Sequence, residues 1–98
     1  MIITKKEPFT KEQVTLLSLS LDLKRITESI QRKSSAANIF NSEAKKWLKE
    51  SKNTNDEYLK KLLTKIEETL ELKNDLKKAE DCLMCSVLIQ NRALQTTK

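Results

Sequence analysis

Apolar residues spaced alternately three and four positions apart run along the first half of the chain. Nine of the ten positions in this stripe are apolar, and Lys33 is the exception. The ten positions are Leu16, Leu19, Leu23, Ile26, Ile30, Lys33, Ala37, Phe40, Ala44 and Trp47. A stripe sustained over so many turns is typical of a long helix with a coiled-coil-like seam. Lys33, with Ser34 and Ser35 after it, marks a kink, a break or a polar position that sets the register.

The start of this helix is marked by Thr10 and Gln13, which have the spacing of a capping box. In that motif the hydroxyl and the amide each satisfy a free backbone N–H group. We therefore expect a loose arm over residues 1–9 and a first helix, with its cap, over residues 10–51.

The second half of the chain carries a similar stripe. Its positions are Leu59, Leu62, Leu63, Ile66, Leu70, Leu72, Leu76, Ala79, Leu83, Val87 and Leu94. The spacing slips between Leu70 and Leu72. Thr54 and Glu57 have the spacing of a second capping box, and the residues before them are polar. The sequence therefore predicts a turn at 52–54 and a second helix over residues 55–95.

Two helices of nearly equal length joined by a short turn are expected to lie antiparallel. The predicted fold is all-α, a helical hairpin that forms a single domain. Because such a hairpin buries only one face of each helix, we expect it to complete a four-helix or larger bundle by oligomerisation. The alternative is a break of the first helix near Ser34, which would give a three-helix bundle.

Some apolar residues lie off the predicted seams. They are Val14, Leu17 and Leu21 in the first helix and Met84 and Leu88 in the second. A turn at 52–54 places residue 88 beside about residue 17, so both sets fall at the open end of the hairpin. This group is the predicted partner-binding surface, because an apolar face that the hairpin cannot cover must meet another chain.

Glycine is absent and there is a single proline, whereas charged residues make up 34% of the chain and aromatic residues 4%. Folds rich in tight turns and loops that cradle phosphate need residues that tolerate positive φ, and this composition supplies almost none. Long helices with solvated charged faces account for the composition better.

No constellation of residues predicts catalysis, a cofactor or a metal. The chain has no histidine, which is the commonest general base. Cys82 and Cys85 form a CxxC motif, but a structural zinc site needs about four ligands and the chain supplies two thiols. The motif also lies inside a helical pattern rather than at the helix start that a redox pair needs. We expect the two thiols to pack in a helix interface and the protein not to be an enzyme.

The chain carries 19 basic and 14 acidic residues, for a formal net charge of +5. Lys24, Arg25 and Arg32 map to outward-facing positions and form a possible polyanion-binding cluster. No aromatic residue lies between them to stack on bases, so a solvated helix face is the favoured interpretation. Lys5 and Lys6 interrupt the apolar start, so no secretory signal is predicted, and no apolar run reaches the roughly 20 residues of a membrane span.

The sequence favours a non-enzymatic interaction or scaffold subunit, cytoplasmic or nuclear, that self-associates or binds other helical chains. The alternative is a small basic protein that binds nucleic acid or another acidic surface through the outer face of the first helix. A steep dependence of binding on salt would distinguish the alternative.

Overall fold

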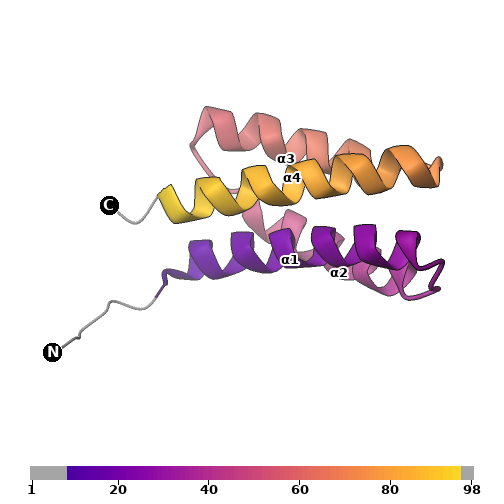
Figure 1. The fold of residues 1–98 in the computed structure, drawn as a ribbon. Helices are drawn as coiled ribbons and strands as arrows, with labels where there is room; N and C mark the ends of the chain where they lie inside the picture. The colour runs from indigo at the N-terminus through magenta and orange to yellow at the C-terminus, as the bar shows by residue number, and fades with distance from the viewer. Residues whose placement is uncertain (1–8, 96–98) are drawn as a thin grey trace, which may run out of the picture.

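The protein is all-helical, as predicted, but each of the two predicted long helices is divided in two. The structure, a computed structural model, describes residues 9–95 (Figure 1), and the predicted arm before residue 9 lies outside them. The four helices are α1 (Lys11–Gln31), α2 (Ala37–Ser51), α3 (Glu57–Leu70) and α4 (Asp75–Gln95). The two-helix hairpin is therefore replaced by four shorter helices.

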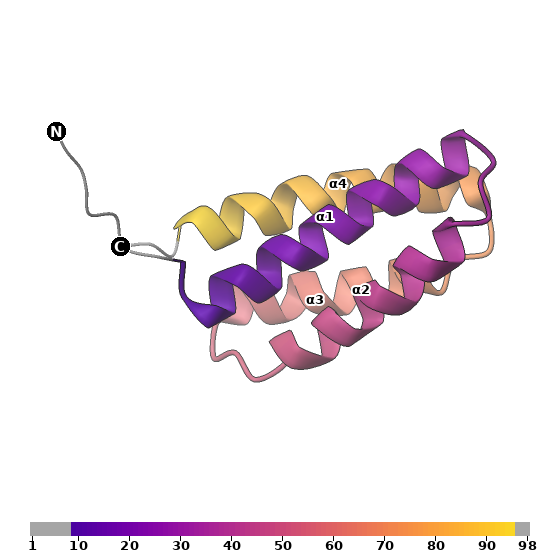
Figure 2. The same cartoon turned by 90° about the horizontal axis from the view of Figure 1, so that it is seen from below.

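The four helices form a bundle in which each helix packs against two neighbours. α1 contacts α2 and α4, and α3 contacts the same two helices. Figures 1 and 2 show consecutive helices running in opposite directions, with the start of α1 and the end of α4 at the same end of the bundle. The chain thus builds a four-helix bundle by itself and does not need a second chain to complete one.

The first break occurs at Lys33, the single polar position of the predicted stripe. Its backbone adopts the left-handed conformation, with φ of 56°. The amide of Ser34 donates to the carbonyl of Ser29 at 2.8 Å, and the amide of Lys33 donates to the carbonyl of Ile30 at 3.0 Å. These two hydrogen bonds form a Schellman motif, which satisfies the last carbonyls of α1. The break lies where the three-helix alternative placed it.

Replacing Lys33 by Gly should stabilise the protein. A side chain with a Cβ disfavours the left-handed conformation, whereas glycine adopts it freely and loses somewhat more chain entropy on folding, so we expect a net gain of about 0.5–1 kcal/mol. Urea unfolding measures the free energy of unfolding. Lys33→Ala is the matched control, because it removes the charge but keeps the Cβ, and it should give no such gain. An equal gain from both variants would contradict this explanation.

The second break, at residues 71–74, coincides with the slip in the spacing between Leu70 and Leu72. α3 ends at Leu70. The Asn74 side chain then accepts a hydrogen bond from the amide of Lys77 at 2.9 Å, which caps the first turn of α4. The prediction of one continuous helix over 55–95 was wrong, because the slip in spacing is a helix boundary.

The helix caps that the sequence predicted are partly confirmed. Thr10 and Gln13 form the capping box, with N···O distances of 2.9 and 3.1 Å. α3 is capped instead by Asp56, whose carboxylate accepts from the amide of Leu59 at 3.1 Å. The Thr54 hydroxyl accepts from the amide of Asp56, so it orders the turn and not the helix. Asp56 also pairs with Arg92, which ties α4 to the start of α3.

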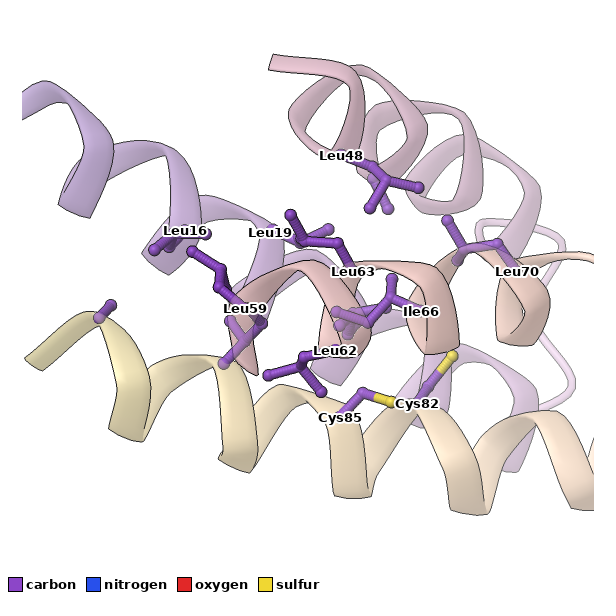
Figure 3. Close-up of a cluster of buried hydrophobic side chains, with 14 of the residues drawn as sticks. Leu16, Leu19, Leu48, Leu59, Leu62, Leu63, Ile66, Leu70, Cys82 and Cys85 are labelled. Atoms are coloured by element: carbon purple, nitrogen blue, oxygen red, sulfur yellow. The ribbon is translucent and has the colours of Figure 1, made fainter. Parts of the chain in front are cut away.

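The predicted stripe forms the core in α1 and α3 but not in α4. Leu16, Leu19, Leu23 and Ile26 of α1 and Leu59, Leu62, Leu63, Ile66 and Leu70 of α3 are buried. In α4 the buried residues are Ala79, Asp81, Cys82, Cys85, Ser86, Ile89 and Ala93. Of the predicted stripe only Ala79 is among them, whereas Leu76, Leu83, Val87 and Leu94 are exposed. Figure 3 shows both cysteines among the leucine and isoleucine side chains of α3. α4 is thus rotated so that its small residues face inward.

Three side chains of α1 explain this rotation, because each donates a hydrogen bond to a backbone carbonyl of α4. The bonds run from Gln13 Nε2 to Ala93 at 3.0 Å, from Ser20 Oγ to Ser86 at 2.8 Å and from Thr27 Oγ1 to Ala79 at 2.8 Å. The donors are seven residues apart, and so are the acceptors. The short side chains of Ser20 and Thr27 reach the neighbouring backbone only if the two helices approach closely, and the small residues of α4 allow that approach.

The three hydrogen bonds also fix the antiparallel register of α1 and α4. In every pair the two residue numbers add up to 106. The register predicted from the turn, which put residue 88 beside residue 17, is within one residue of this. The prediction remained accurate because the two helix breaks lie at nearly matching distances from the central turn.

Enlarging a small residue at the α1–α4 contact should destabilise the bundle. Ser86 is fully buried, so Ser86→Leu forces the helices apart and strains the Ser20 hydrogen bond. We expect a loss of about 2–3 kcal/mol or more in the free energy of unfolding, measured by chemical denaturation. Gln90→Leu, at an exposed position one turn later on the same helix, should change stability by less than about 0.5 kcal/mol. Similar values for both variants would show that the helices are not closely packed at Ser86.

Candidate interaction surface

Two uncharged segments lie side by side on the bundle. No charged residue occurs in residues 13–21 or in residues 82–91, although 34% of the chain is charged. The register of α1 and α4 places the first segment beside residues 85–93. Arg92, the one charged residue of 85–93, pairs with Asp56 at the start of α3, so the outward surface of the two helices is uncharged over this stretch.

The side chains that face outward here follow from their positions relative to Ser20 and Ser86, which mark the contact line between the helices. Leu17 and Leu21 lie three residues before and one residue after Ser20, about 60° and 100° around α1. Leu83 and Val87 have the same spacing relative to Ser86. Because the helices are antiparallel, these equal rotations bring all four side chains to the same face, opposite α2 and α3.

We call this surface the outer strip. Its members are Val14, Leu17 and Leu21 of α1 and Leu83, Val87 and Leu94 of α4. Leu17 is partly buried against the core, and the other five are between 43% and 48% exposed. In the order that the register gives, the six side chains, three from each helix, follow one another along about 16 Å of the bundle. The outer strip is therefore one continuous apolar surface.

The predicted partner-binding residues are only partly brought together. Val14, Leu17 and Leu21 all belong to the outer strip. Met84 is exposed, but it follows Leu83 by one residue and lies at the margin of α4 away from α1. Leu88 is partly buried against the core, and its position two residues after Ser86 places it on the side of α4 opposite α1. The α4 residues of the strip, Leu83, Val87 and Leu94, belong to the stripe that the sequence predicted to be the buried seam of the second helix.

The basic cluster is divided between different surroundings. The guanidinium of Arg25 lies 5.5 Å from the centre of the Phe40 ring, an arrangement that gives a cation–π contact. Arg32 is the C-cap residue directly after α1. Lys24 is exposed. Arg25 therefore helps to hold α2 against α1.

The two cysteines are buried in the core and are free thiols. Burial raises the pKa of Cys82 to about 12. Burial also raises the pKa of Cys85, although a hydrogen bond with Thr69 acts in the opposite direction. A thiolate is the reactive and metal-binding form, and it is scarce at neutral pH when the pKa is raised. Residues 9–95 contain no group of three or more metal-ligating side chains.

A buried carboxylate lies between α1 and α2. Asp22 is 3% exposed, and its Oδ2 atom has no hydrogen-bond partner within the described part of the chain. Burial raises the pKa of Asp22 from 3.8 to about 6, and the hydrogen-bonded carboxyl of Glu43 acts in the same direction. Arg25 and Trp47 oppose this shift. At pH 7 the Asp22 carboxyl is therefore mostly ionised, although its buried site favours the neutral form.

Replacing Asp22 by Asn should stabilise the protein at neutral pH. The folded chain keeps the Asp22 proton up to about pH 6, whereas the unfolded chain loses it near 3.8, so the wild type loses stability as pH rises from 4 to 7. We expect Asp22→Asn to remove about 2–3 kcal/mol of that loss, because the amide is neutral and still donates to Glu43.

Urea unfolding at pH 4, 5.5 and 7, followed by the fluorescence of Trp47, measures this effect. The stability difference between Asp22→Asn and the wild type should increase with pH. Glu68→Gln, at an exposed position of α3, is the control and should leave the pH profile unchanged. A constant difference between Asp22→Asn and the wild type across this range would contradict the assignment.

Comparison with models of protein families, with curated protein sequences and with solved structures finds no match to this chain. Within residues 9–95 no helix is long and apolar enough to cross a membrane. Any account of function therefore rests on the chain's own geometry.

Proposed function

We propose that this protein is a non-enzymatic interaction subunit that binds helices of another chain through the outer strip. The observation that supports it is the strip itself, a continuous apolar surface without charge on a chain whose other helix faces are highly charged. Contiguous exposed apolar surface of this kind is typical of protein–protein contacts. The two free thiols fit a reducing compartment, the cytoplasm or the nucleus.

The energy of such a contact is adequate for binding. A fully buried Leu or Val contributes roughly 1.5–3 kcal/mol relative to an exposed one, and the five exposed members of the strip have almost half of that still to gain. Their sum is comparable to the cost of association for a contact of moderate affinity. An apolar helix face that docks against a helix or into a groove is a common mode of recognition.

The titratable groups also favour binding over catalysis. The buried pair of thiols and the buried Asp22 are enclosed by packing, and no histidine is present. A catalytic acid or base must reach a substrate at hydrogen-bonding distance, which these positions do not allow.

Leu21→Lys tests the proposal, since it places a charge within the strip at a side chain that is outside the core. The variant should have the same circular dichroism spectrum as the wild type. After mild chemical cross-linking in the source cells, the helical proteins that are cross-linked to the wild type should be missing from the variant. Ile39→Lys is the matched control, because Ile39 is an exposed apolar residue of α2 outside the strip, and it should behave as the wild type. Identical cross-linked products for Leu21→Lys and the wild type would contradict the proposal.

A further inference from the structure

We propose that α2 is a pH-sensitive element of the bundle, which docks on α1 while the carboxyl pair of Asp22 and Glu43 holds a proton and opens more readily once both carboxyls are ionised. α2 takes no part in the outer strip, so this opening is separate from the proposed function. Two features of the structure support it. Few residues of α2 are buried, and the helix covers a carboxyl group that lacks a full set of partners.

α2 has the fewest buried residues of the four helices. Only Ala44, Leu48 and Ser51 are buried, and Leu48 is the one large aliphatic side chain among them. Phe40 and Trp47 are partly buried against the core. α3 is one residue shorter, yet all its buried residues except one are leucine or isoleucine. Because stabilisation grows with the apolar area removed from water, α2 is held less strongly than α3.

The contact between α2 and α3 is the smallest of the four helix contacts. Two ion pairs cross it, Lys45 with Glu71 at 3.0 Å and Lys52 with Glu67 at 3.1 Å, and all four side chains are about half exposed or more. Exposed ion pairs contribute little to stability, because water and salt screen them. α2 can therefore separate from α3 at small cost.

On its other side α2 covers Asp22 of α1. Asp22 is buried, and its Oδ2 atom has no hydrogen-bond partner within the described part of the chain. The carboxyl of Glu43 lies within hydrogen-bonding reach of it. Two ionised carboxylates only accept hydrogen bonds, whereas a protonated one can donate to the other. A proton therefore adds a bond between α1 and α2, and its loss leaves two like charges at the same contact.

The remaining groups around Asp22 do not cancel this effect. Burial and Glu43 raise the pKa of Asp22 to about 6, although Arg25 of α1 and Trp47 of α2 act in the opposite direction. α4 presents no charge at this height, because its residues 82–91 are uncharged. α3 lies diagonally opposite α1 and does not contact it. The charge of Asp22 therefore acts mainly on the contact between α1 and α2.

The direction of the pH dependence follows from the two states of α2. Opening hydrates Asp22, so its pKa returns toward 3.8 from about 6 in the closed form. A group whose pKa is raised in the closed form stabilises that form at low pH, and the stabilisation is lost as pH rises through the raised pKa. The equilibrium constant for opening should thus increase about tenfold between pH 5 and pH 7. A detached helix of this length is marginal in water, so its amides exchange with solvent.

Hydrogen exchange of the full chain at pH 5, 6 and 7, followed by mass spectrometry, tests the opening. The protection factor compares each segment with the unfolded chain at the same pH, which removes the intrinsic pH dependence of exchange. In the wild type, protection of α2 should be about tenfold or more below that of α4 at pH 7. It should also fall about tenfold from pH 5 to pH 7. Equal protection of α2 and α4 at every pH would overturn the proposal, because exchange would then require unfolding of the whole bundle.

Three variants test the carboxyl pair, and circular dichroism verifies that each is folded. Asp22→Asn removes the titrating group, so protection of α2 should change by less than about twofold over this range. Glu43→Gln alters an exposed side chain and should keep only part of the fall, because Asp22 stays buried but the like charge is gone. Glu50→Gln removes an exposed carboxylate from the same helix and, as the matched control, should keep the full fall. A full fall in Asp22→Asn, or equal falls in Glu43→Gln and Glu50→Gln, would overturn the proposal.

Discussion

The close contact between α1 and α4 is the constraint on which the rest of the bundle depends. Its hydrogen bonds from Ser20 and Thr27 to backbone carbonyls require small residues at matching positions of α4, and Ala79, Ser86 and Ala93 supply them. A purely apolar seam tolerates slippage by one heptad, because leucine fits against leucine in several registers. Polar donors that must each find a carbonyl allow one register only, since a buried hydroxyl without a partner costs about 1–3 kcal/mol.

The same contact explains what the sequence could and could not predict. The stripes of α1 and α3 consist of large aliphatic residues at regular spacing, so their buried faces were predicted correctly. In α4 the large residues Leu83, Val87 and Leu94 lie outward. The face of α4 that contacts α1 must carry small residues, because the two helices approach each other closely there. The signal was present in the chain as donors at 13, 20 and 27 opposite small residues at 79, 86 and 93. It becomes visible only when the two segments are compared in antiparallel register.

The helix boundaries were harder to predict for a different reason. Neither break contains glycine or a proline, so the usual markers are missing. At the first break Lys33 takes the left-handed conformation that glycine normally provides, and only its position in an otherwise apolar stripe indicated it. At the second break Asn74 caps α4 by one hydrogen bond. The hydrogen bonds that close these helix ends are local, but the residues that make them are not the usual markers of a helix boundary.

The outer strip follows from the orientation of α4. A rotation of α4 by about one residue, or 100°, would bury Leu83 and Val87 and turn the two thiols away from the core instead. The close contact with α1 prevents that rotation, so the apolar side chains remain outside. A bundle that has only to stay folded would carry lysine and glutamate at these positions, as α3 does on its exposed face with Lys60, Lys61 and Glu68. Leucine and valine there contribute little to the fold of one chain, and they are the residues that a helix-binding surface requires.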